Sequence, residues 1–376
     1  MILQRFTALR YRNIRESELS FSPGMNLLSG ENAQGKTNVL EGIYFFARGK
    51  SFRGAADGEQ VLFGERGFSL SLSYLSGERE NTLAYRFENG KREREKNGYT
   101  VSSASEMIGS FRAVLFYPEH LSLVKGGPAE RRLFLNVAVS QLDGVYIRRL
   151  SAYQKQLENR NILLKNAQKT GYLDRDLLDS FSEGMAAAAA YIHLRREEYI
   201  ERLLPYAEDF LSLLSGGRER LILSYESSLG THGAEIIRDK ESKDREKALC
   251  EAYFRLFCGH IGREIAAGTT LFGIQRDDME IKIGERDARL YASQGQQRSV
   301  VLALKLGEGE VAREVGGEYP VYLFDDVLSE LDEARRLSVL SMGGDRQMIV
   351  TSCEAGALGR YAAREIRVEN GVYTPR

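Results

Sequence analysis

The stretch that decides the fold is Gly30-Glu31-Asn32-Ala33-Gln34-Gly35-Lys36-Thr37. It fits the pattern GxxxxGK[ST] and stands between an apolar run at residues 25–28 and a helix-forming run at residues 39–46. A strand, a glycine-rich turn and a helix in this order aim backbone N–H groups and the positive end of the helix dipole at one point, where phosphate oxygens bind. The segment therefore predicts a phosphate-binding loop rather than a surface turn.

Two side chains of this loop have separate expected tasks. Lys36 is expected to reach the outer phosphates of a nucleoside triphosphate as a point charge. The hydroxyl of Thr37 is expected to ligate Mg2+. All eight residues of the loop are therefore candidate nucleotide contacts, and Lys36 is also a candidate catalytic residue.

A second segment, Val321-Tyr322-Leu323-Phe324-Asp325-Asp326, is an apolar run that ends in two carboxylates. A buried parallel strand delivers such groups at the carboxyl edge of its sheet. We expect Asp325 to hold Mg2+ and Asp326 to orient or deprotonate the attacking water. Alone, the pair would also fit a solvated strand end or a helix cap, but the phosphate-binding loop favours the catalytic interpretation.

Between these segments lies Ser293-Gln294-Gly295-Gln296-Gln297-Arg298, which opens a helical stretch at residues 299–313. It resembles the signature motif of ABC-type ATPases, in which a serine and a glycine at a helix N-terminus contact the γ-phosphate held by the opposite subunit. The alternative is a capping serine. The spacing to Asp325 leaves room for one helix and a turn, and residues 327–332 resemble the D-loop of that class. Ser293, Gly295 and Gln296 are therefore predicted to contact ATP.

The order of these motifs predicts a dimer. In this class the signature helix does not fold back onto the phosphate-binding loop of its own chain, so the composite site forms only when two heads face each other. We therefore expect a symmetric homodimer held together by ATP and Mg2+.

The chemistry at the acid pair is expected to be slow. ABC-type ATPases usually have glutamate where this chain has Asp326, and the shorter side chain holds a water less well in line. A switch histidine is also missing, since residues 346–350 are followed by Thr351-Ser352-Cys353. A hydroxyl of this segment can still bond a phosphate or water. The sequence thus predicts weak hydrolysis of ATP to ADP and phosphate, suited to a timer.

Composition excludes several other classes. With 43% apolar and 28% charged residues the chain is expected to be globular, and no apolar run approaches the length of a membrane span. Without a signal-peptide pattern, a cytoplasmic location is predicted. The three cysteines, Cys250, Cys258 and Cys353, form no ligand grouping and are interpreted as buried or incidental thiols. The net charge of −1 requires any nucleic-acid surface to be local.

The pattern along the chain predicts an α/β fold, with an ABC-type P-loop ATPase head of mixed sheet and helices and an inserted, mainly helical second domain. The head is assigned to residues 1–117 and 268–376, and the insertion to 118–267. The expected strands of the head's first part are at residues 2–9, 18–21, 25–28, 68–75, 82–87 and 113–117, with a helix at 38–47. The expected helices of the insertion are at residues 128–142, 145–169, 173–214 and 236–267, with a strand at 221–225.

Further motifs resemble the RecF family of bacterial recombination-repair ATPases over nearly the whole chain. They are residues 9–15 (LRYRNIR), 40–44 (LEGIY), 49–53 (GKSFR), 116–119 (FYPE), 124–128 (VKGGP), 131–135 (RRLFL) and 276–278 (RDD). The chain departs from the family pattern at Asn136, where the family tends to have Asp, and at Ile274-Gln275, where it usually has Pro-His.

The resemblance implies an ATP-gated dimeric clamp on double-stranded DNA next to single-strand gaps. It also implies roles in recombinational repair, replication restart and SOS induction, with RecO and RecR as partners that help RecA to load. Candidate DNA contacts are Lys91, Arg92, Arg94, Lys96, Arg131, Arg132, Arg148, Arg149, Arg195 and Arg196. Glutamates interleave several of these, so a solvated mixed-charge surface is the alternative for each cluster. For adenine, residues 11–15 are candidates for stacking or polar contacts, with a strand-end loop as the alternative.

Two other protein classes are alternatives to this interpretation. A transporter ATPase subunit would share the loop, signature and acid pair, but it should carry a switch histidine, a catalytic glutamate and a shorter helical insertion. A P-loop kinase acting on a small molecule would make the signature and D-loop coincidental. Release of free phosphate, stimulated by DNA, would distinguish the clamp from the kinase.

Overall fold

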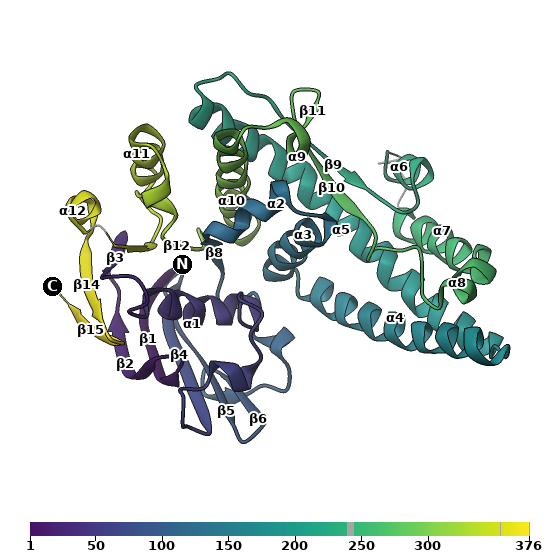
Figure 1. The fold of residues 1–376 in the computed structure, drawn as a ribbon, viewed down its shortest axis with the longest axis horizontal. Coiled ribbons are helices and arrows are strands. Elements are labelled where there is room, and N and C mark those ends of the chain that lie inside the picture. The colour runs from purple at the N-terminus through teal and green to yellow at the C-terminus, as the bar shows by residue number, and fades with distance from the viewer. Residues whose placement is uncertain (239–243, 354, 376) are drawn as a thin grey trace. The chain divides into compact units, whose positions relative to one another are not determined.

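The computed structural model describes residues 1–238, 244–353 and 355–375, which divide into two compact units (Figure 1). The first unit is Met1–Leu121, Tyr206–Arg220 and Gln294–Arg376, and the second is Ser122–Pro205 and Leu221–Ser293. Compared with the predicted ranges, residues 118–121 and 206–220 group with the head and residues 268–293 with the second unit. The latter difference has a physical cause, because a strand at Asp278–Ile283 pairs with one at Leu221–Glu226.

The first unit contains, among the described residues, two six-stranded sheets. The antiparallel sheet has the order β2 (Ile14–Ser20), β1 (Ile2–Tyr11), β4 (Gly67–Ser76), β5 (Arg79–Glu88), β6 (Lys91–Lys96) and β7 (Tyr99–Thr100). The second sheet has the order β15 (Val372–Pro375), β14 (Arg364–Glu369), β3 (Met25–Ser29), β13 (Met348–Ser352), β12 (Val321–Asp325) and β8 (Ala113–Phe116). Only its β14–β15 pair is antiparallel among the described pairs.

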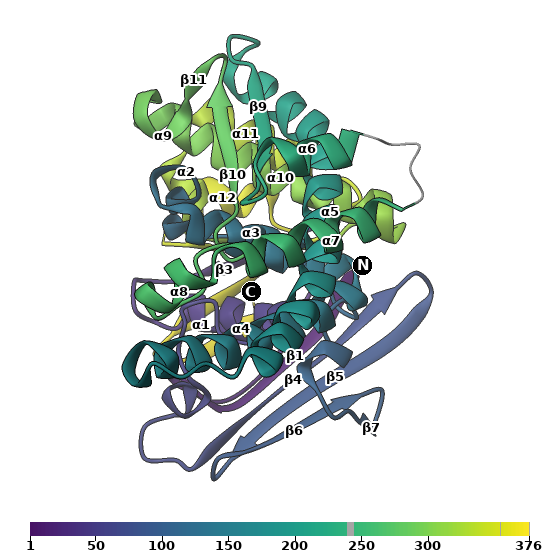
Figure 2. The same cartoon turned by 90° about the vertical axis from the view of Figure 1, so that its right-hand side faces the viewer.

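Two tight hairpins connect the last three strands of the antiparallel sheet, β5, β6 and β7 (Figure 2). Asn89-Gly90 joins β5 to β6 with φ of 49° and 80°, and Asn97-Gly98 joins β6 to β7 with φ of 52° and 78°. Positive φ at both central residues is the geometry of a type I′ turn, which asparagine and glycine tolerate and whose twist suits antiparallel neighbours. The register of β5, β6 and β7 therefore follows from local sequence.

The mainly parallel sheet explains the apolar runs seen in the sequence. Every residue of β3, β8, β12 and β13 is buried, because helices cover this sheet. Helix α1 (Lys36–Arg48) contacts β12 of this sheet and also packs on the antiparallel sheet, where Phe45 and Tyr85 have ring centroids 4.5 Å apart. Parallel strands end at one edge, so the segments after β3, β12 and β13 are brought together there.

The second unit is mainly helical. Its helices are α2 (Ser122–Lys125), α3 (Pro128–Leu142), α4 (Gly144–Thr170), α6 (Thr231–Arg238), α7 (Arg245–Gly259), α8 (Ile261–Ala267) and α9 (Ala288–Tyr291). Helix α5 (Arg175–Ser215) belongs to both units, which divide at Pro205 inside it. A three-stranded antiparallel sheet joins β9 (Leu221–Glu226), β10 (Asp278–Ile283) and β11 (Arg286–Asp287).

One helical prediction was wrong in this unit. The stretch 236–267 was expected to be one helix, but α7 ends at Gly259 and α8 starts at Ile261. His260 leaves the helical conformation with φ −124° and ψ 14°, and glycine before it favours a break because it loses more backbone freedom in a helix than other residues. Residues 239–243 of the same stretch lie outside the described residues.

The remaining elements of the first unit are short or lie beside the mainly parallel sheet. They are η1 (Asp57–Gln60), η2 (Ala104–Glu106), η3 (Pro118–Leu121), α10 (Gln294–Gly316), η4 (Val327–Glu330), α11 (Glu333–Ser341), α12 (Ala355–Leu358) and η5 (Gly359–Tyr361). Within the described part of the chain, none of the helices combines the length and the apolar character that crossing a membrane requires.

Candidate nucleotide-binding site

The loop between β3 and α1 has a backbone that only its glycines permit. Gly30 and Gly35 have φ of 158° and 115°, and Ala33 between them has φ of 64°. A Cβ on Gly30 would lie 2.2 Å from the backbone oxygen of Val368, and one on Gly35 would lie 2.7 Å from Oδ1 of Asn13. The two glycines of the pattern are thus required by the fold around the loop as well as by a ligand.

Lys36 is folded onto the loop that precedes it. Its side chain is buried, and Nζ donates to the backbone oxygens of Gly30 at 2.6 Å and Glu31 at 2.8 Å. The loop borders a pocket of about 360 Å³, which is within the size range of small-molecule sites. The pocket is lined by Ser29, Gly30, Glu31, Gln34, Cys353, Arg367, Val368, Glu369 and Asn370.

The two predicted Mg2+ ligands lie next to each other. The hydroxyl of Thr37 donates to Oδ1 of Asp325 at 2.8 Å, and the hydroxyl of Thr351 donates to the same oxygen at 2.9 Å. Burial raises the pKa of Asp325 above its usual value, and the two hydroxyl donors partly oppose this rise. The site is therefore a buried carboxylate held in place by two hydroxyls.

This donor set fits Mg2+, which prefers oxygen ligands and keeps several non-protein ones. Among the described residues there is no group of three or more His, Cys, Asp or Glu side chains that could hold a metal ion. A Mg2+ ion held by Thr37 and Asp325 would therefore complete its coordination with phosphate oxygens and water.

Asp326 has an unusual backbone conformation, with φ of 56°. Such a conformation is costly for a residue other than glycine and persists only where the surroundings enforce it. Two bonds do so here, since the N–H of Asp326 donates to Oγ1 of Thr351 at 2.9 Å and Ser329 Oγ donates to the oxygen of Asp326 at 2.6 Å. The second acid thus has a defined position directly after Asp325.

Cys353 was interpreted as a buried or incidental thiol, and the structure shows that it is not buried. The residue is exposed and lies in the pocket. Its Sγ accepts from Lys36 Nζ at 3.3 Å and donates to Oδ1 of Asn32 at 2.8 Å. Thr351, by contrast, is buried and its hydroxyl bonds Asp325. No local sequence pattern indicates this, because the residue that follows β13 faces the loop only through the pairing of β13 with β3.

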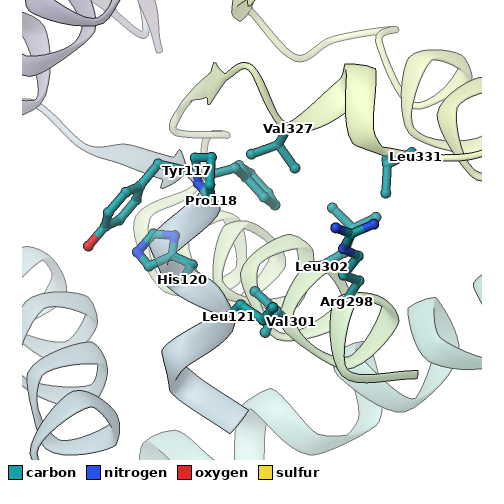
Figure 3. A pocket seen from close by; sticks show the side chains of 10 residues that line it. Tyr117, Pro118, His120, Leu121, Arg298, Val301, Leu302, Val327 and Leu331 are labelled. Atoms are coloured by element: carbon teal, nitrogen blue, oxygen red, sulfur yellow. The ribbon is translucent and has the colours of Figure 1, made fainter. Parts of the chain in front are cut away.

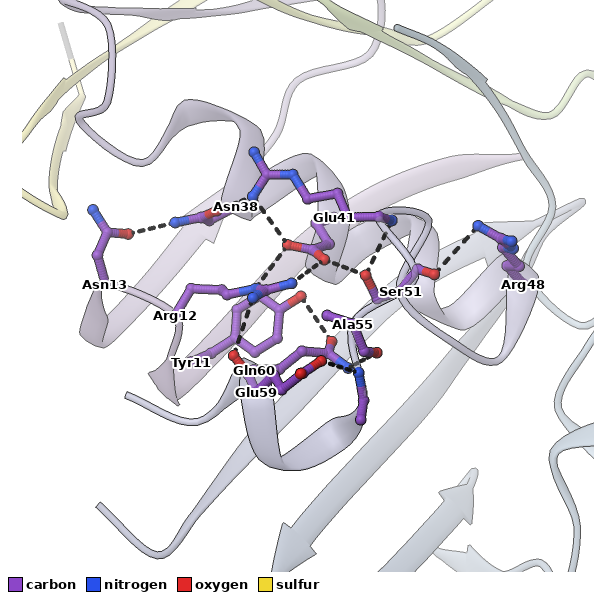
Figure 4. Close-up of polar contacts among 12 residues, drawn as sticks. Tyr11, Arg12, Asn13, Asn38, Glu41, Arg48, Ser51, Ala55, Glu59 and Gln60 are labelled. Atoms are coloured by element: carbon purple, nitrogen blue, oxygen red, sulfur yellow. Dashed lines mark hydrogen bonds and ion pairs between the residues drawn. The ribbon is translucent and has the colours of Figure 1, made fainter. Parts of the chain in front are cut away.

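A buried carboxylate on α1 organises one flank of the loop (Figure 4). Glu41 is fully buried and accepts from Arg12 Nε at 3.0 Å, from Arg12 Nη2 at 2.6 Å and from Ser51 Oγ at 2.5 Å. Nη1 of Arg53 lies 3.6 Å from the same carboxylate. An ionised carboxylate at this depth requires such partners, so Glu41 ties β1 and the segment after α1 to the nucleotide helix.

The candidates for adenine contact include a buried residue, Tyr11, and an exposed one, Asn13. Tyr11 is fully buried, and its hydroxyl donates to Gln60 Oε1 at 3.2 Å, so its ring has no free face for a base. Asn13 lies beside the loop instead: its Nδ2 donates to the oxygen of Gln34 at 3.1 Å, and its Oδ1 accepts from Asn38 at 2.8 Å. Tyr11 is therefore excluded as a stacking ring, while adenine contact by the exposed Asn13 and Arg15 stays a prediction.

The signature residues lie at the start of a helix, as the sequence indicates. Helix α10 begins at Gln294, Ser293 directly precedes it and is exposed, and Gln296 is half-buried. A Cβ on Gly295 would meet no atom within 4 Å, so packing inside this chain does not require a glycine there. Contact of these residues with a nucleotide of a second subunit stays a prediction.

A small apolar pocket lies beside the N-terminal part of α10 (Figure 3). Its volume is about 50 Å³, far below the roughly 300–1,000 Å³ of small-molecule sites. Its lining comprises Phe116, Tyr117, Pro118, His120, Leu121, Arg298, Val301, Leu302, Val327 and Leu331. Burial, with Lys305 and Arg48 nearby, lowers the pKa of His120 well below its usual value.

The candidate DNA contacts fall into two groups. Arg131 and Arg196 are buried: the guanidinium of Arg131 makes two 2.7 Å bonds to Asp278, and that of Arg196 donates to the hydroxyl of Tyr146 at 3.0 Å and the oxygen of Ile274 at 3.0 Å. A phosphate contact by either would require these bonds to break. Sequence alone missed this because both side chains bind partners that are distant along the chain.

The other candidates are more accessible. Arg132 is half-buried and donates to the oxygen of Asp277 at 2.8 Å, and Arg195 pairs with Glu198. Arg148 and Arg149 are exposed on α4. Lys91, Arg92, Arg94 and Lys96 all lie on β6.

The fold and the site together define the class. A parallel sheet with a phosphate-binding loop and an acid pair at its end, in a chain that also has a signature-like sequence at the start of a helix, is an ABC-type ATPase head, as the sequence predicts. A profile described as an AAA domain matches residues 9–249.

Comparison with known proteins narrows the class to a family. The chain is 37% identical to the DNA replication and repair protein RecF of Halalkalibacterium halodurans, over 98% of this chain and 97% of that protein. It is 36% identical to the protein of the same name from Desulfitobacterium hafniense, over 96% of each. The chain belongs to the RecF family, which confirms the resemblance.

Solved structures agree. The structure described as the recombination mediator protein RecF-ATP in the RecFOR pathway superposes with a TM-score of 0.90 at 33% identity, covering 100% of this chain and 97% of the other. A Smc head domain from Pyrococcus furiosus, described as bound to the C-terminal domain of ScpA, gives a TM-score of 0.56 at 16% identity, covering 100% of this chain and 96% of the other. The second likeness concerns the fold alone, and the predicted fold class is confirmed.

Proposed function

We propose that this chain binds ATP and Mg2+ and acts in DNA replication and repair as an ATP-controlled DNA-binding protein. The observation that carries the proposal is the 2.8 Å bond between Thr37 and Asp325 beside the buried Lys36. These three side chains come from a loop and a strand far apart in sequence, and their types match what a triphosphate with Mg2+ requires. Its relatives' names supply the process, DNA replication and repair.

The roles of the residues follow from their positions. The N–H groups of residues 30–37 bind phosphate oxygens, and Lys36 exchanges its bonds to the oxygens of Gly30 and Glu31 for bonds to phosphate. Thr37 and Asp325 hold Mg2+, which neutralises phosphate charge when bound. Asp326, held by the backbone after Asp325, orients the attacking water.

The proposed ATPase activity is weak. Asp326 is one methylene shorter than the glutamate usual for the class, and no histidine follows β13. Hydrolysis then limits how long the ATP-bound state lasts rather than driving motion.

The ATP-bound state is proposed to be a symmetric dimer. Gly295 is the second residue of α10, and a Cβ on it would meet no atom of this chain within 4 Å, so the position is open to the approach of a second molecule. We assign that approach to the nucleotide held by the partner's phosphate-binding loop, with Ser293, Gly295 and Gln296 as its contacts.

This dimer is proposed to clamp double-stranded DNA next to single-strand gaps. RecO and RecR are proposed partners because a structure of a relative is described as belonging to the RecFOR pathway. RecA loading, replication restart and SOS induction are proposed on family resemblance, with the mainly helical insertion as the second domain of the clamp.

Two measurements test the proposal. Light scattering of the full chain should show a monomer without nucleotide and a dimer with ATP and Mg2+; an oligomeric state that ignores ATP would contradict it. DNA binding by wild type and Lys36→Arg, each with and without ATP, tests the control by nucleotide. Wild type should bind DNA more tightly with ATP, while the variant should lose this response; equal binding in all four cases would refute the control.

A further inference from the structure

Three basic residues of strand β6 lie on one face of the sheet, and its two glutamates lie on the other. Along its sequence, Lys91-Arg92-Glu93-Arg94-Glu95-Lys96, basic and acidic residues alternate in a way that resembles a mixed-charge surface. In a strand, however, successive side chains point to opposite faces. Arg92, Arg94 and Lys96 therefore share one face, and both glutamates lie on the other.

The pairing with β5 identifies these faces. Arg94 lies opposite Tyr85 and Lys96 opposite Leu83, and directly opposed residues of an antiparallel pair share a face. The guanidinium of Arg94 lies 5.5 Å from the centre of the Tyr85 ring, which agrees with this register. The face that carries the three cations is thus the one on which the inward side chains of β5 lie.

An exposed aromatic ring extends the same face. Tyr99 of β7 lies opposite Lys96, and 78% of Tyr99 is exposed. We call Arg92, Arg94, Lys96 and Tyr99 the basic face of β6; Figure 2 labels the two strands that carry these residues, β6 and β7. Exposed rings beside cations are the combination that proteins use to contact bases and sugars together with phosphates.

The three cations of this face outnumber the one carboxylate beside them, Asp57, which also acts on Tyr85 next to Arg94. Arg92 pairs with Asp57, their closest atoms being 2.5 Å apart. In the part of the chain that the structure describes, Arg94 and Lys96 have no ion-pair partner. Residues two apart on a strand are spaced by about 6.6 Å, so the cations form a row rather than a point. A row of like charge suits a polyanion with regularly spaced charges better than a single small anion.

We infer that the basic face of β6 binds the phosphate backbone of nucleic acid. The inference rests on the proposed DNA-binding function and names the surface responsible for part of it. Arg94 and Lys96 contact phosphates, Tyr99 packs against a neighbouring sugar or base, and Arg92 adds charge from its pair with Asp57. Because backbone contacts carry no sequence information, this face binds without regard to sequence.

The test compares two double variants of the full chain that remove the same charge from the two faces of one sheet. Arg94→Gln with Lys96→Gln changes the basic face, and Arg86→Gln with Lys91→Gln is the matched control. Arg86 and Lys91 pair across the strands with Glu93 and Glu88 on the opposite face. Affinity for a labelled duplex is measured in ATP and Mg2+ over a range of salt concentrations, and ATP binding is measured for every variant.

The basic-face variant should bind DNA about tenfold to thirtyfold more weakly near physiological salt, and its slope of log affinity against log salt should fall by about two. The control should keep the wild-type slope, and both variants should bind ATP as wild type does. Equal weakening by both variants would show an effect of net charge and overturn the inference, as would unchanged binding by the basic-face variant. Failure of wild type itself to bind DNA would instead refute the proposed function.

Discussion

The substitution Asp325→Asn should have different effects on the free and the nucleotide-bound protein. Asp325 is only 7% exposed and accepts hydrogen bonds from the hydroxyls of Thr37 and Thr351. Burial raises its pKa, so the ionised form is disfavoured in the folded protein without nucleotide. The amide oxygen of asparagine can accept the same two bonds without a charge. We expect the free variant to be more stable than wild type at neutral pH by about 1–3 kcal/mol.

The sign of the pH dependence follows from the raised pKa. Between the ordinary value of 3.8 and the higher folded-state value, the folded protein binds more protons at Asp325 than the unfolded chain does. Stability of wild type from this group is therefore lost as pH rises through that window. The advantage of Asp325→Asn should be absent below the ordinary value and complete above the folded-state pKa.

Adding ATP and Mg2+ should stabilise wild type more than the variant and so reduce the variant's advantage. A ligand at a hundredfold excess over its dissociation constant stabilises the folded state by about 2.7 kcal/mol. Wild type should gain this amount, whereas the variant lacks the anionic ligand for Mg2+ and should gain much less.

Denaturant unfolding measures both effects, first in a chelator and then with ATP and Mg2+. Asp345→Asn is the control because Asp345 is exposed and outside the site, so its stability should match wild type in both conditions. A free Asp325→Asn protein less stable than wild type would refute the account of burial. An undiminished response to ATP and Mg2+ would refute the assignment of Asp325 as a metal ligand.

Three further predictions concern α10, the pocket and the second unit. Gly295→Ala should leave the monomer folded but weaken ATP-dependent dimerisation, as measured by light scattering, and an unaffected dimer would contradict the signature role. Gly309→Ala, by contrast, should lower the unfolding temperature, because a Cβ on Gly309 would lie 1.9 Å from the hydroxyl oxygen of Tyr322. Alkylation of Cys353 should reduce binding of a fluorescent ATP analogue, and prior ATP should protect the thiol, since Sγ contacts Lys36; unaltered binding by fully alkylated protein would exclude this. Glu264→Ala should destabilise the second unit by about 3–5 kcal/mol in denaturant unfolding, because the substitution leaves the buried Arg160 without its carboxylate partner. A loss of stability under about 1 kcal/mol would show that the ion pair is dispensable.

The local elements of this protein are largely predictable because they depend on near neighbours. The expected helix at 128–142 coincides with α3, and the expected strand at 25–28 lies within β3. The Asn-Gly turns, the glycines of the phosphate-binding loop and the acid pair after β12 are likewise recognisable, since each needs a particular residue type at a particular backbone position. The failure at 236–267 shows the limit, because His260 alone leaves the helical conformation between α7 and α8.

By itself, therefore, the amino-acid order determined the phosphate-binding loop, the acid pair, the helix that begins at the signature and the family. Only the tertiary structure decided that β13 lies between β3 and β12, which brings Cys353 to Lys36 and Thr351 to Asp325. It also decided that Arg131 and Arg196 are buried. The reason is physical: the partner of a strand or a buried charge is selected by the packing of all elements together, and residues hundreds of positions apart leave no local pattern of that choice.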